Sequence, residues 1–131
     1  MSRQFSDVVT ILDAQSATGT GITFDVREYQ HVTLTLATAS NANLTVKFQG
    51  ALASEPDFSA SRSVSNHWDY VAVYDLEDAS IIDGDTGIAP AGTDDFRNLL
   101  LNVDGIDFIT ATVTARSAGS VTIKARGYTN D

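Results

Sequence analysis

Three aspartates in one turn-rich segment come closest to the spacing of a metal site. Asp83, Asp85 and Asp94 fall at the first, third and twelfth positions of a calcium-binding loop. The sixth position, where such a loop needs glycine for its sharp turn, is Ile88, and the eighth is Pro90. We therefore expect a turn-rich loop whose aspartates cap backbone amides, with a calcium ion as the alternative.

The rest of the sequence offers little for catalysis. His31 and His67 lie near the starts of predicted strands, and their spacing suits neither a metal pair nor a nucleophile with its base. No nucleophile elbow, phosphate-binding loop or dinucleotide fingerprint is present, and the chain has no cysteine. A pair of carboxylates for glycoside hydrolysis can always be picked from 17 acidic residues, so their presence alone carries no weight. We expect a protein that is not an enzyme and uses no cofactor.

The segment HWDYVAVYDL, residues 67–76, concentrates aromatic side chains. On one strand, Trp68, Tyr70 and Tyr74 would share a face and the valines the other, because successive side chains alternate. If the valines point to the core, the rings stand outside, where they suit a protein interface or stacking on sugar rings. If the rings point inward, they fill the core. The sequence leaves all three interpretations open.

Alternation of apolar and polar residues dominates the chain, and helical periodicity is almost absent. In HVTLTLAT, for example, Val32, Leu34 and Leu36 face one way and the intervening threonines the other. Such half-buried strands, separated by polar turns, are what two antiparallel sheets packed face to face require. The sequence therefore predicts an all-β protein, an antiparallel β-sandwich of about eight strands. The predicted strands are 7–12, 21–26, 31–38, 43–49, 67–76, 97–103, 108–116 and 120–126.

Two parts of the chain repeat each other. Residues 26–50, VREYQHVTLTLATASNANLTVKFQG, align without a gap with residues 103–127, VDGIDFITATVTARSAGSVTIKARG, when the chain is shifted by 77 positions (103 − 26). Lys47 then meets Lys124, and apolar positions meet apolar positions. Each copy is interpreted as a β-hairpin, and we expect the two hairpins to occupy equivalent places, as the paired Greek keys of a jelly roll do. An accidental match of threonine-rich strands is the alternative.

Length and charge limit the possible partners. The 131 residues are enough for one self-sufficient domain, residues 1–131. A formal net charge of -9 disfavours nucleic acid, because binding a polyanion depends on basic residues. No apolar run is long enough to span a membrane or to form the core of a signal peptide, so we expect no membrane partner and no secretory signal.

Irregular segments are the candidate contact surfaces. A short N-terminal arm, about residues 1–6, precedes the first strand. Two long segments, 51–66 and 77–96, interrupt the strands, and loops of this length in a compact domain usually have a function or are ordered by a partner. Together with the aromatic strand, they give the candidate contact residues Arg3, Phe5, Asp57, Phe58, Arg62, Trp68, Tyr70 and Tyr74.

Four stretches cover most of the chain from about residue 20 onward: YQHVTLTLATASNANLTVKFQGA, PDFSASRSVSNHWDYVAVYDLED, IDGDTGI and GTDDFRNLLLNVDGIDFITATVTARSAGSVTIKARGY. Taken together, they resemble small structural proteins of tailed bacteriophages. The resemblance lies in the overall sequence pattern and not in a catalytic motif. The proteins that the chain resembles are jelly-roll or β-sandwich head decoration (cement) proteins and related tail modules.

The resemblance implies a virion protein that binds the major capsid protein on the outer head surface and stabilises the head. It also implies a small homo-oligomer, a dimer or trimer, assembled in the host cytoplasm. A tail or neck connector or a host-attachment module is the second interpretation. A carbohydrate-binding module that uses the three aromatic residues of segment 67–76 is the third.

Overall fold

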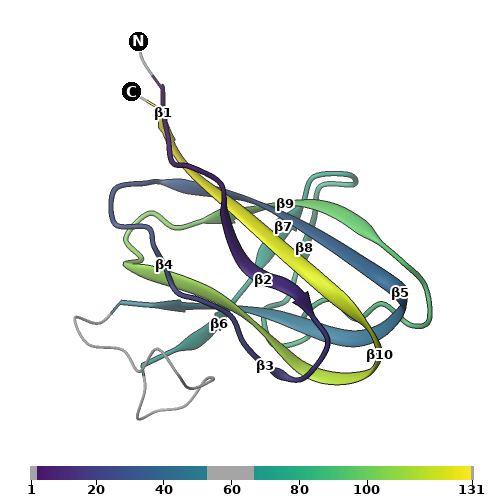
Figure 1. Ribbon diagram of the computed structural model, residues 1–131. Coiled ribbons are helices and arrows are strands. Elements are labelled where there is room, and N and C mark those ends of the chain that lie inside the picture. Colours follow the sequence, from purple (N-terminus) through teal and green to yellow (C-terminus); the bar gives the residue numbers. More distant parts are fainter. Residues whose placement is uncertain (1–2, 53–66, 131) are drawn as a thin grey trace.

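The computed structural model describes residues 3–52 and 67–130, which form strands and their connections (Figure 1). These residues include no helix, and hence none long and apolar enough to cross a membrane. The strands found in this part of the chain are β1 (Arg3–Phe5), β2 (Val9–Gln15), β3 (Gly19–Thr20), β4 (Phe24–Asp25), β5 (His31–Ala51), β6 (Asp69–Val71), β7 (Val73–Asp75), β8 (Ser80–Ile82), β9 (Phe96–Asn102) and β10 (Phe108–Asn130).

Two long strands, β5 and β10, form the frame of the molecule and pair antiparallel along their length. Each bends near its middle, where Ser40 and Asn41 in β5 and Gly119 in β10 have positive φ angles and the pairing register shifts. In Figure 1 both strands run to the same end of the molecule and double back. The predicted hairpins are therefore wrong in form. The two halves of each copy make one bent strand, and that strand pairs with the other copy.

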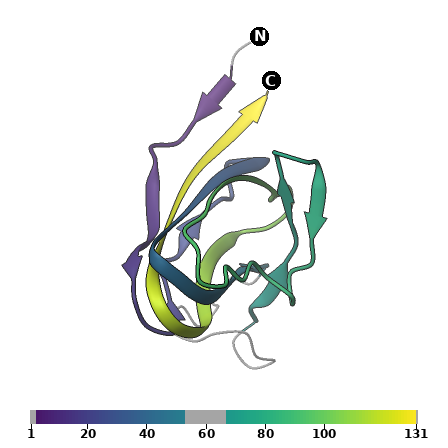
Figure 2. The same ribbon diagram turned by 90° about the vertical axis from the view of Figure 1, so that its right-hand side faces the viewer.

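The bends fold the sheet back on itself into two facing layers, as the view onto the bends in Figure 2 shows. In the first layer, the second half of β10 and the first half of β5 lie between β1 and β2 on one side and β9, β7 and β8 on the other. In the second layer, the other halves lie between β3 and β4 on one side and β6 on the other. These pairings are antiparallel, so the fold is the predicted antiparallel β-sandwich.

The pairing register and the positions of the bends together place the two copies of the repeat in equivalent positions. Val46 pairs with Val113, and the residues one repeat away from them, Ile123 and Leu36, also pair with each other. A local two-fold axis therefore passes between the two bends and exchanges the copies. The bends also correspond, because the shift by 77 positions takes Asn41 to Ala118, the residue immediately before Gly119.

The core lies between the layers and follows the predicted alternation. Val32, Leu34 and Leu36 have no exposed surface, and burial of each such side chain stabilises the fold by about 1.5–3 kcal/mol. The corresponding inward positions of the other strand halves are also buried, and they are Leu44, Val46, Phe48, Ile109, Ala111, Val113, Val121, Ile123 and Ala125.

The orientation of a few residues differs from the alternation. Ala115, expected inside, is exposed because a register shift immediately before it turns the strand over. Thr110 and Thr112, expected outside, are buried beside residues 19–22. Their hydroxyl groups donate to carbonyl oxygens of that segment, at 2.8 and 3.1 Å.

The predicted strand 67–76 is two short strands that belong to different layers. β6 pairs with β5 in the second layer and β7 pairs with β9 in the first, so the chain crosses between layers at Ala72. Four of the predicted strands are halves of β5 and β10, whereas β1, β3 and β8 lie outside the predicted strands.

Candidate functional site

The outer face of the first layer carries the strongest candidates for contact with other molecules. Because paired residues of neighbouring strands point to the same side of a sheet, the register gives rows of side chains across this face. One row runs from Arg126 through Thr33, Leu100 and Tyr74 to Ile81. It joins a basic groove over β10 and β5 to an apolar edge at β7 and β8.

The N-terminal arm forms one wall of the groove. β1 pairs with the end of β10, and both extend beyond the rest of the sandwich in Figure 1. The backbone N–H of Ser6 donates to the carbonyl oxygen of Gly127 at 2.8 Å, and the N–H of Gly127 donates to Ser6 Oγ at 2.9 Å. The half-exposed Phe5 ring lies 6.3 Å from that of Tyr128, measured between centroids, and 5.6 Å from the guanidinium carbon of Arg126. The predicted arm thus continues the sheet as a strand.

Between this arm and the sheet lies a groove of about 540 Å³. Thr33 and Thr35 contribute hydroxyl groups to it, and Lys124 and Arg126 contribute exposed cationic side chains. Within the described residues these two cations have no ion pair, whereas three other basic residues are each paired with an aspartate. The apolar part of the lining consists of Phe5, Val8 and Tyr128.

The opposite side of the same face is apolar. Tyr74 and Ile81 are paired between β7 and β8, and they are 39% and 72% exposed. Leu76 and Phe96 lie together at the end of these strands, 50% and 63% exposed. In the described part of the chain β8 is the last strand of this layer. Apolar side chains beside an edge strand are typical of a surface that another protein chain covers.

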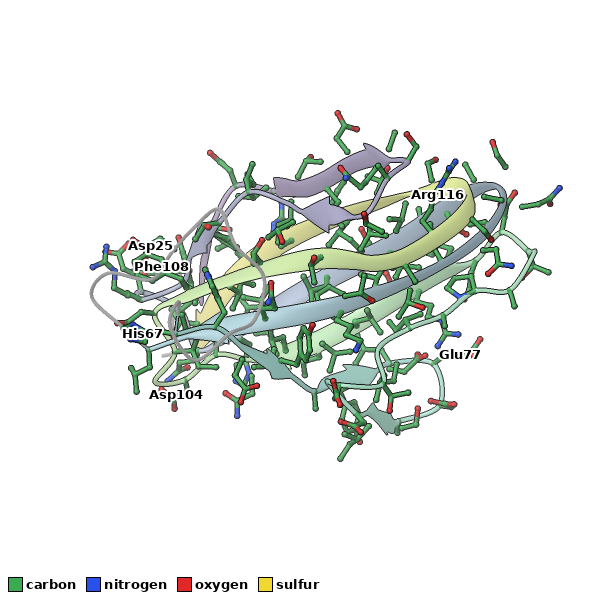
Figure 3. All side chains as sticks on the ribbon, turned by 90° about the horizontal axis from the view of Figure 1, so that it is seen from below. Asp25, His67, Glu77, Asp104, Phe108 and Arg116 are labelled. Atoms are coloured by element: carbon green, nitrogen blue, oxygen red, sulfur yellow. The ribbon has the colours of Figure 1, made fainter. Side chains whose placement is uncertain are left out.

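A charge network fixes one end of this edge. Arg97 donates through Nε to Asp95 Oδ2 at 2.7 Å and through Nη1 to Asp75 Oδ2 at 3.2 Å. Asp75 is only 6% exposed, and its Oδ1 also accepts the backbone N–H of Glu77 at 3.0 Å. The hydrogen bond to Asp95 raises the pKa of Arg97 above its usual range. Figure 3 places Glu77 towards the bend end of the molecule, as it does Arg116.

A second ion pair lies towards the opposite end, where Figure 3 shows Asp25 beside Phe108. Arg27 Nη2 is 2.6 Å from Asp25 Oδ2, and its guanidinium carbon is 5.2 Å from the centroid of the Phe108 ring. The hydrogen bond from Arg27 lowers the pKa of Asp25 below its usual range. Both charged side chains are about half exposed, so the pair contributes little to stability.

The structure separates the three aromatic residues of segment 67–76. Trp68 is 3% exposed and packs inside the domain. Tyr70 belongs to the second layer, where Lys47 Nζ lies 4.7 Å from its ring centroid, and Tyr74 belongs to the first. The expected single aromatic face is therefore wrong, and a three-ring platform for carbohydrate is not formed.

The remaining predicted contact residues have mixed outcomes. Asp57, Phe58 and Arg62 lie outside the described residues. Arg3 belongs to β1, but its side chain is also outside what the structure describes. Phe5 and Tyr74 are the predicted residues that the structure places on the outer face of the first layer.

Sequence reasoning missed most of this face. Lys124 and Arg126 alternate with buried residues in the predicted strand 120–126, which indicates an outward direction but no special role. Ile81 and Ile82 are two successive β-branched apolar residues inside a polar loop, and they are the signal by which β8 was detectable.

The aspartate-rich segment mainly caps backbone groups, as expected. Asp83 Oδ1 accepts the N–H of Asp85 at 3.1 Å, and Asp94 Oδ1 accepts the N–H of Asn41 at 2.8 Å. Asp85 Oδ1 lies 3.4 Å from Lys47 Nζ. The three carboxylates thus serve different partners. Among the residues that the structure describes, no three potential metal ligands lie together.

These features define an antiparallel β-sandwich whose candidate site is a contact face. The sequence matches no known protein family and no curated protein. Among solved structures, the fold is similar to that of SPBc2 prophage-derived protein YomS, with a TM-score of 0.73 and 12% identity over 98% of this chain and 96% of that chain. It is also similar to PBSX exported protein XepA, with a TM-score of 0.73 and 13% identity over 98% of this chain but only 39% of that chain. At these identities the likeness establishes the fold.

Proposed function

We propose that this chain is a non-enzymatic structural protein of a tailed phage particle. The observation that carries the proposal is the likeness to SPBc2 prophage-derived protein YomS, which spans nearly the whole of both chains. The resemblance of the sequence to small phage structural proteins supports the same proposal. A rigid sandwich with a broad contact face suits a protein whose role is to bind neighbours.

Its proposed place is the outer surface of the head, where it binds the major capsid protein and stabilises the shell. The basic groove and the apolar edge lie at opposite sides of one face, so a single copy has two chemically distinct contact regions. Many identical contacts repeated over a shell add to a large total effect even when each is weak. The net charge of -9 opposes adhesion to nucleic acid.

We propose further that the chain forms a dimer or trimer. The apolar edge is the best-suited surface for contact between copies, because Tyr74 and Ile81 are exposed next to an edge strand. Covering such an edge removes apolar surface from water and protects it from unspecific strand pairing.

Particles assembled without this chain provide the test of the decoration role. Purified chain is added to them, and bound and free chain are separated on a density gradient. The temperature at which the particles release DNA is then measured with a dye. We expect the chain to sediment with the heads and to raise the release temperature. A chain that stays at the top of the gradient, or binds without raising that temperature, contradicts the decoration role.

Two matched variants locate the contact face in the same experiment. Ile81→Asp places a charge on the outer face of the first layer. Ile22→Asp places one at an apolar side chain that is 56% exposed between β3 and β4, at the edge of the second layer. We expect only the first variant to lose binding to the heads. Equal losses would mean that this face is not the contact surface.

A tail or neck connector or a host-attachment module is the second candidate. XepA supports it, because this chain matches 39% of that protein, and a fold that forms part of a longer chain suits a modular connector. Binding to isolated tails, with no binding to heads, would favour this candidate.

A further inference from the structure

The repeat gives the outer face of the first layer a twin in the second layer. The shift by 77 positions takes Thr35 to Thr112 and Lys47 to Lys124. The pairing agrees, because Thr35 pairs with Lys124 in the first layer and Thr112 pairs with Lys47 in the second. Each layer therefore presents the same arrangement of a lysine beside a threonine on its outer face.

In the second layer, the chain itself covers this arrangement. Thr112 and the neighbouring Thr110 are buried, and their hydroxyl groups donate to backbone carbonyl oxygens of residues 19–22. Lys47 has a carboxylate partner, since its Nζ lies 3.4 Å from Asp85 Oδ1. In the covered twin, backbone carbonyl oxygens accept hydrogen bonds from the threonines and a carboxylate pairs with the lysine. These are the groups that a ligand of the uncovered twin would have to supply.

In the first layer, the same positions are uncovered. Thr33 and Thr35 are partly exposed, and Lys124 is exposed with no ion pair among the described residues. Arg126 stands where the second layer has Gln49, which is completely buried. The uncovered twin thus carries one more positive charge than the covered one, in a chain whose net charge is -9.

Each layer also has an aromatic ring near a cation, although Lys47 and Arg126 are not equivalent positions of the repeat. Tyr70 lies 4.7 Å from Lys47 Nζ in the second layer, and Phe5 lies 5.6 Å from the guanidinium carbon of Arg126 in the first. In the first layer the ring comes from the N-terminal arm, which leaves the groove of about 540 Å³ beneath it. The groove therefore presents the same lysine and threonine as the covered site, and no segment among the described residues fills it.

We propose that this groove binds an extended acidic segment of a partner protein. The segment supplies carboxylates to Lys124 and Arg126 and backbone carbonyl oxygens to Thr33 and Thr35. The two cations are at alternate positions of one strand, roughly 7 Å apart, which matches carboxylates at alternate positions of an extended peptide. The inference goes beyond the virion proposal and does not depend on it, because it concerns the chemistry of the ligand and not the particle that carries it.

The chain's own covering sequence supplies a probe. The peptide IDGDTGIA, residues 82–89, carries two aspartates at alternate positions. It is titrated into the full-length, isotope-labelled protein, and backbone amide signals are followed by NMR. We expect binding with a dissociation constant on the order of 1 mM and shifts confined to β5 and β10 around Thr33, Thr35, Lys124 and Arg126. The same peptide with both aspartates replaced by asparagine should bind about tenfold more weakly.

A pair of charge-reversal variants separates this site from general electrostatic attraction. Lys124→Glu should weaken binding of the peptide about tenfold, and Arg116→Glu, an equal change of charge at the bend end of the molecule, should leave binding unchanged. Equal losses in the two variants, or shifts spread over the whole surface, overturn the proposal. A second result also overturns the proposal: the peptide does not bind at a concentration about tenfold above the expected dissociation constant, and Lys124→Glu changes the sedimenting mass of the protein. The groove would then be occupied by a second copy of the chain.

Discussion

At the level of single residues, burial decides what each charged group contributes. Asp75 of β7 is almost completely buried, and its ion pair with Arg97 of β9 links these two strands. Asp25 and Arg27 form a shorter ion pair, but their side chains are about half exposed. Water screens the exposed pair, and the buried carboxylate depends on its protein partners. The shorter contact is therefore expected to be the less important one for stability.

Arg97→Gln tests this difference. The substitution leaves the buried Asp75 carboxylate without its cationic partner, and we expect the free energy of unfolding to fall by about 1–3 kcal/mol. Arg27→Gln removes the exposed pair and should cost less than about 1 kcal/mol. Urea unfolding followed by tryptophan fluorescence measures both values. A larger loss in Arg27→Gln would mean that burial does not determine the contribution.

The lowered pKa of Asp25 predicts a pH dependence of known sign. A carboxyl group whose pKa is lower in the folded state stabilises the fold above its unfolded pKa, and this contribution is lost as the pH falls through the folded value. Asp25→Asn should therefore lower the thermal midpoint slightly at about pH 6, and the difference from the parent protein should shrink as acid protonates the carboxyl group. A difference that grows on acidification would contradict this assignment.

At the level of elements, the two bends determine the architecture. They turn one long antiparallel pair into parts of both layers, and Gly119 allows the bend in β10 because its φ angle is +77°. A Cβ atom at this position would lie 2.5 Å from Ala42 Cα, so the two bends are in close contact. Residues with side chains are excluded there both by the backbone angle and by the lack of space.

Gly119→Ala should therefore be strongly destabilising. Gly105→Ala is the matched control, because Gly105 has a similar φ angle of +89° but no atom within 4 Å of an added Cβ. We expect the control to cost about 1–2 kcal/mol and Gly119→Ala to cost about 1–3 kcal/mol more. Differential scanning calorimetry of the two variants gives the comparison. Equal losses would show that the contact between the bends is not tight.

The N-terminal arm is the other element with a separable role. Removing residues 1–5 deletes β1 and the Phe5 wall of the groove but keeps the hydrogen bonds of Ser6 with Gly127. Because a two-stranded ribbon adds little stability on its own, we expect almost no change in the thermal midpoint and a clear loss of binding to particles. A parallel loss of both would make the arm part of the fold and not a contact element.

At the level of the whole molecule, the sequence predicts the sandwich well and the contact face poorly. Alternation identifies the inward side of most strands because it depends only on which face is buried, as Val32, Leu34 and Leu36 show. It does not distinguish two hairpins from two bent strands, because both place the same residues inward. The separation of Trp68 from Tyr74 depends on a crossing at Ala72 that leaves no signal in the alternation. The outer face joins residues from β1, β5, β7, β8 and β10, and only the topology brings these together.

The proposed decoration role depends most directly on where the protein lies on phage particles. Immunogold electron microscopy with an antibody raised against this chain measures this on purified particles from the source of the gene. The proposed function predicts gold label spread over the heads. Label confined to tails or necks would contradict the decoration role and favour the connector, and unlabelled particles would contradict a structural role in the virion.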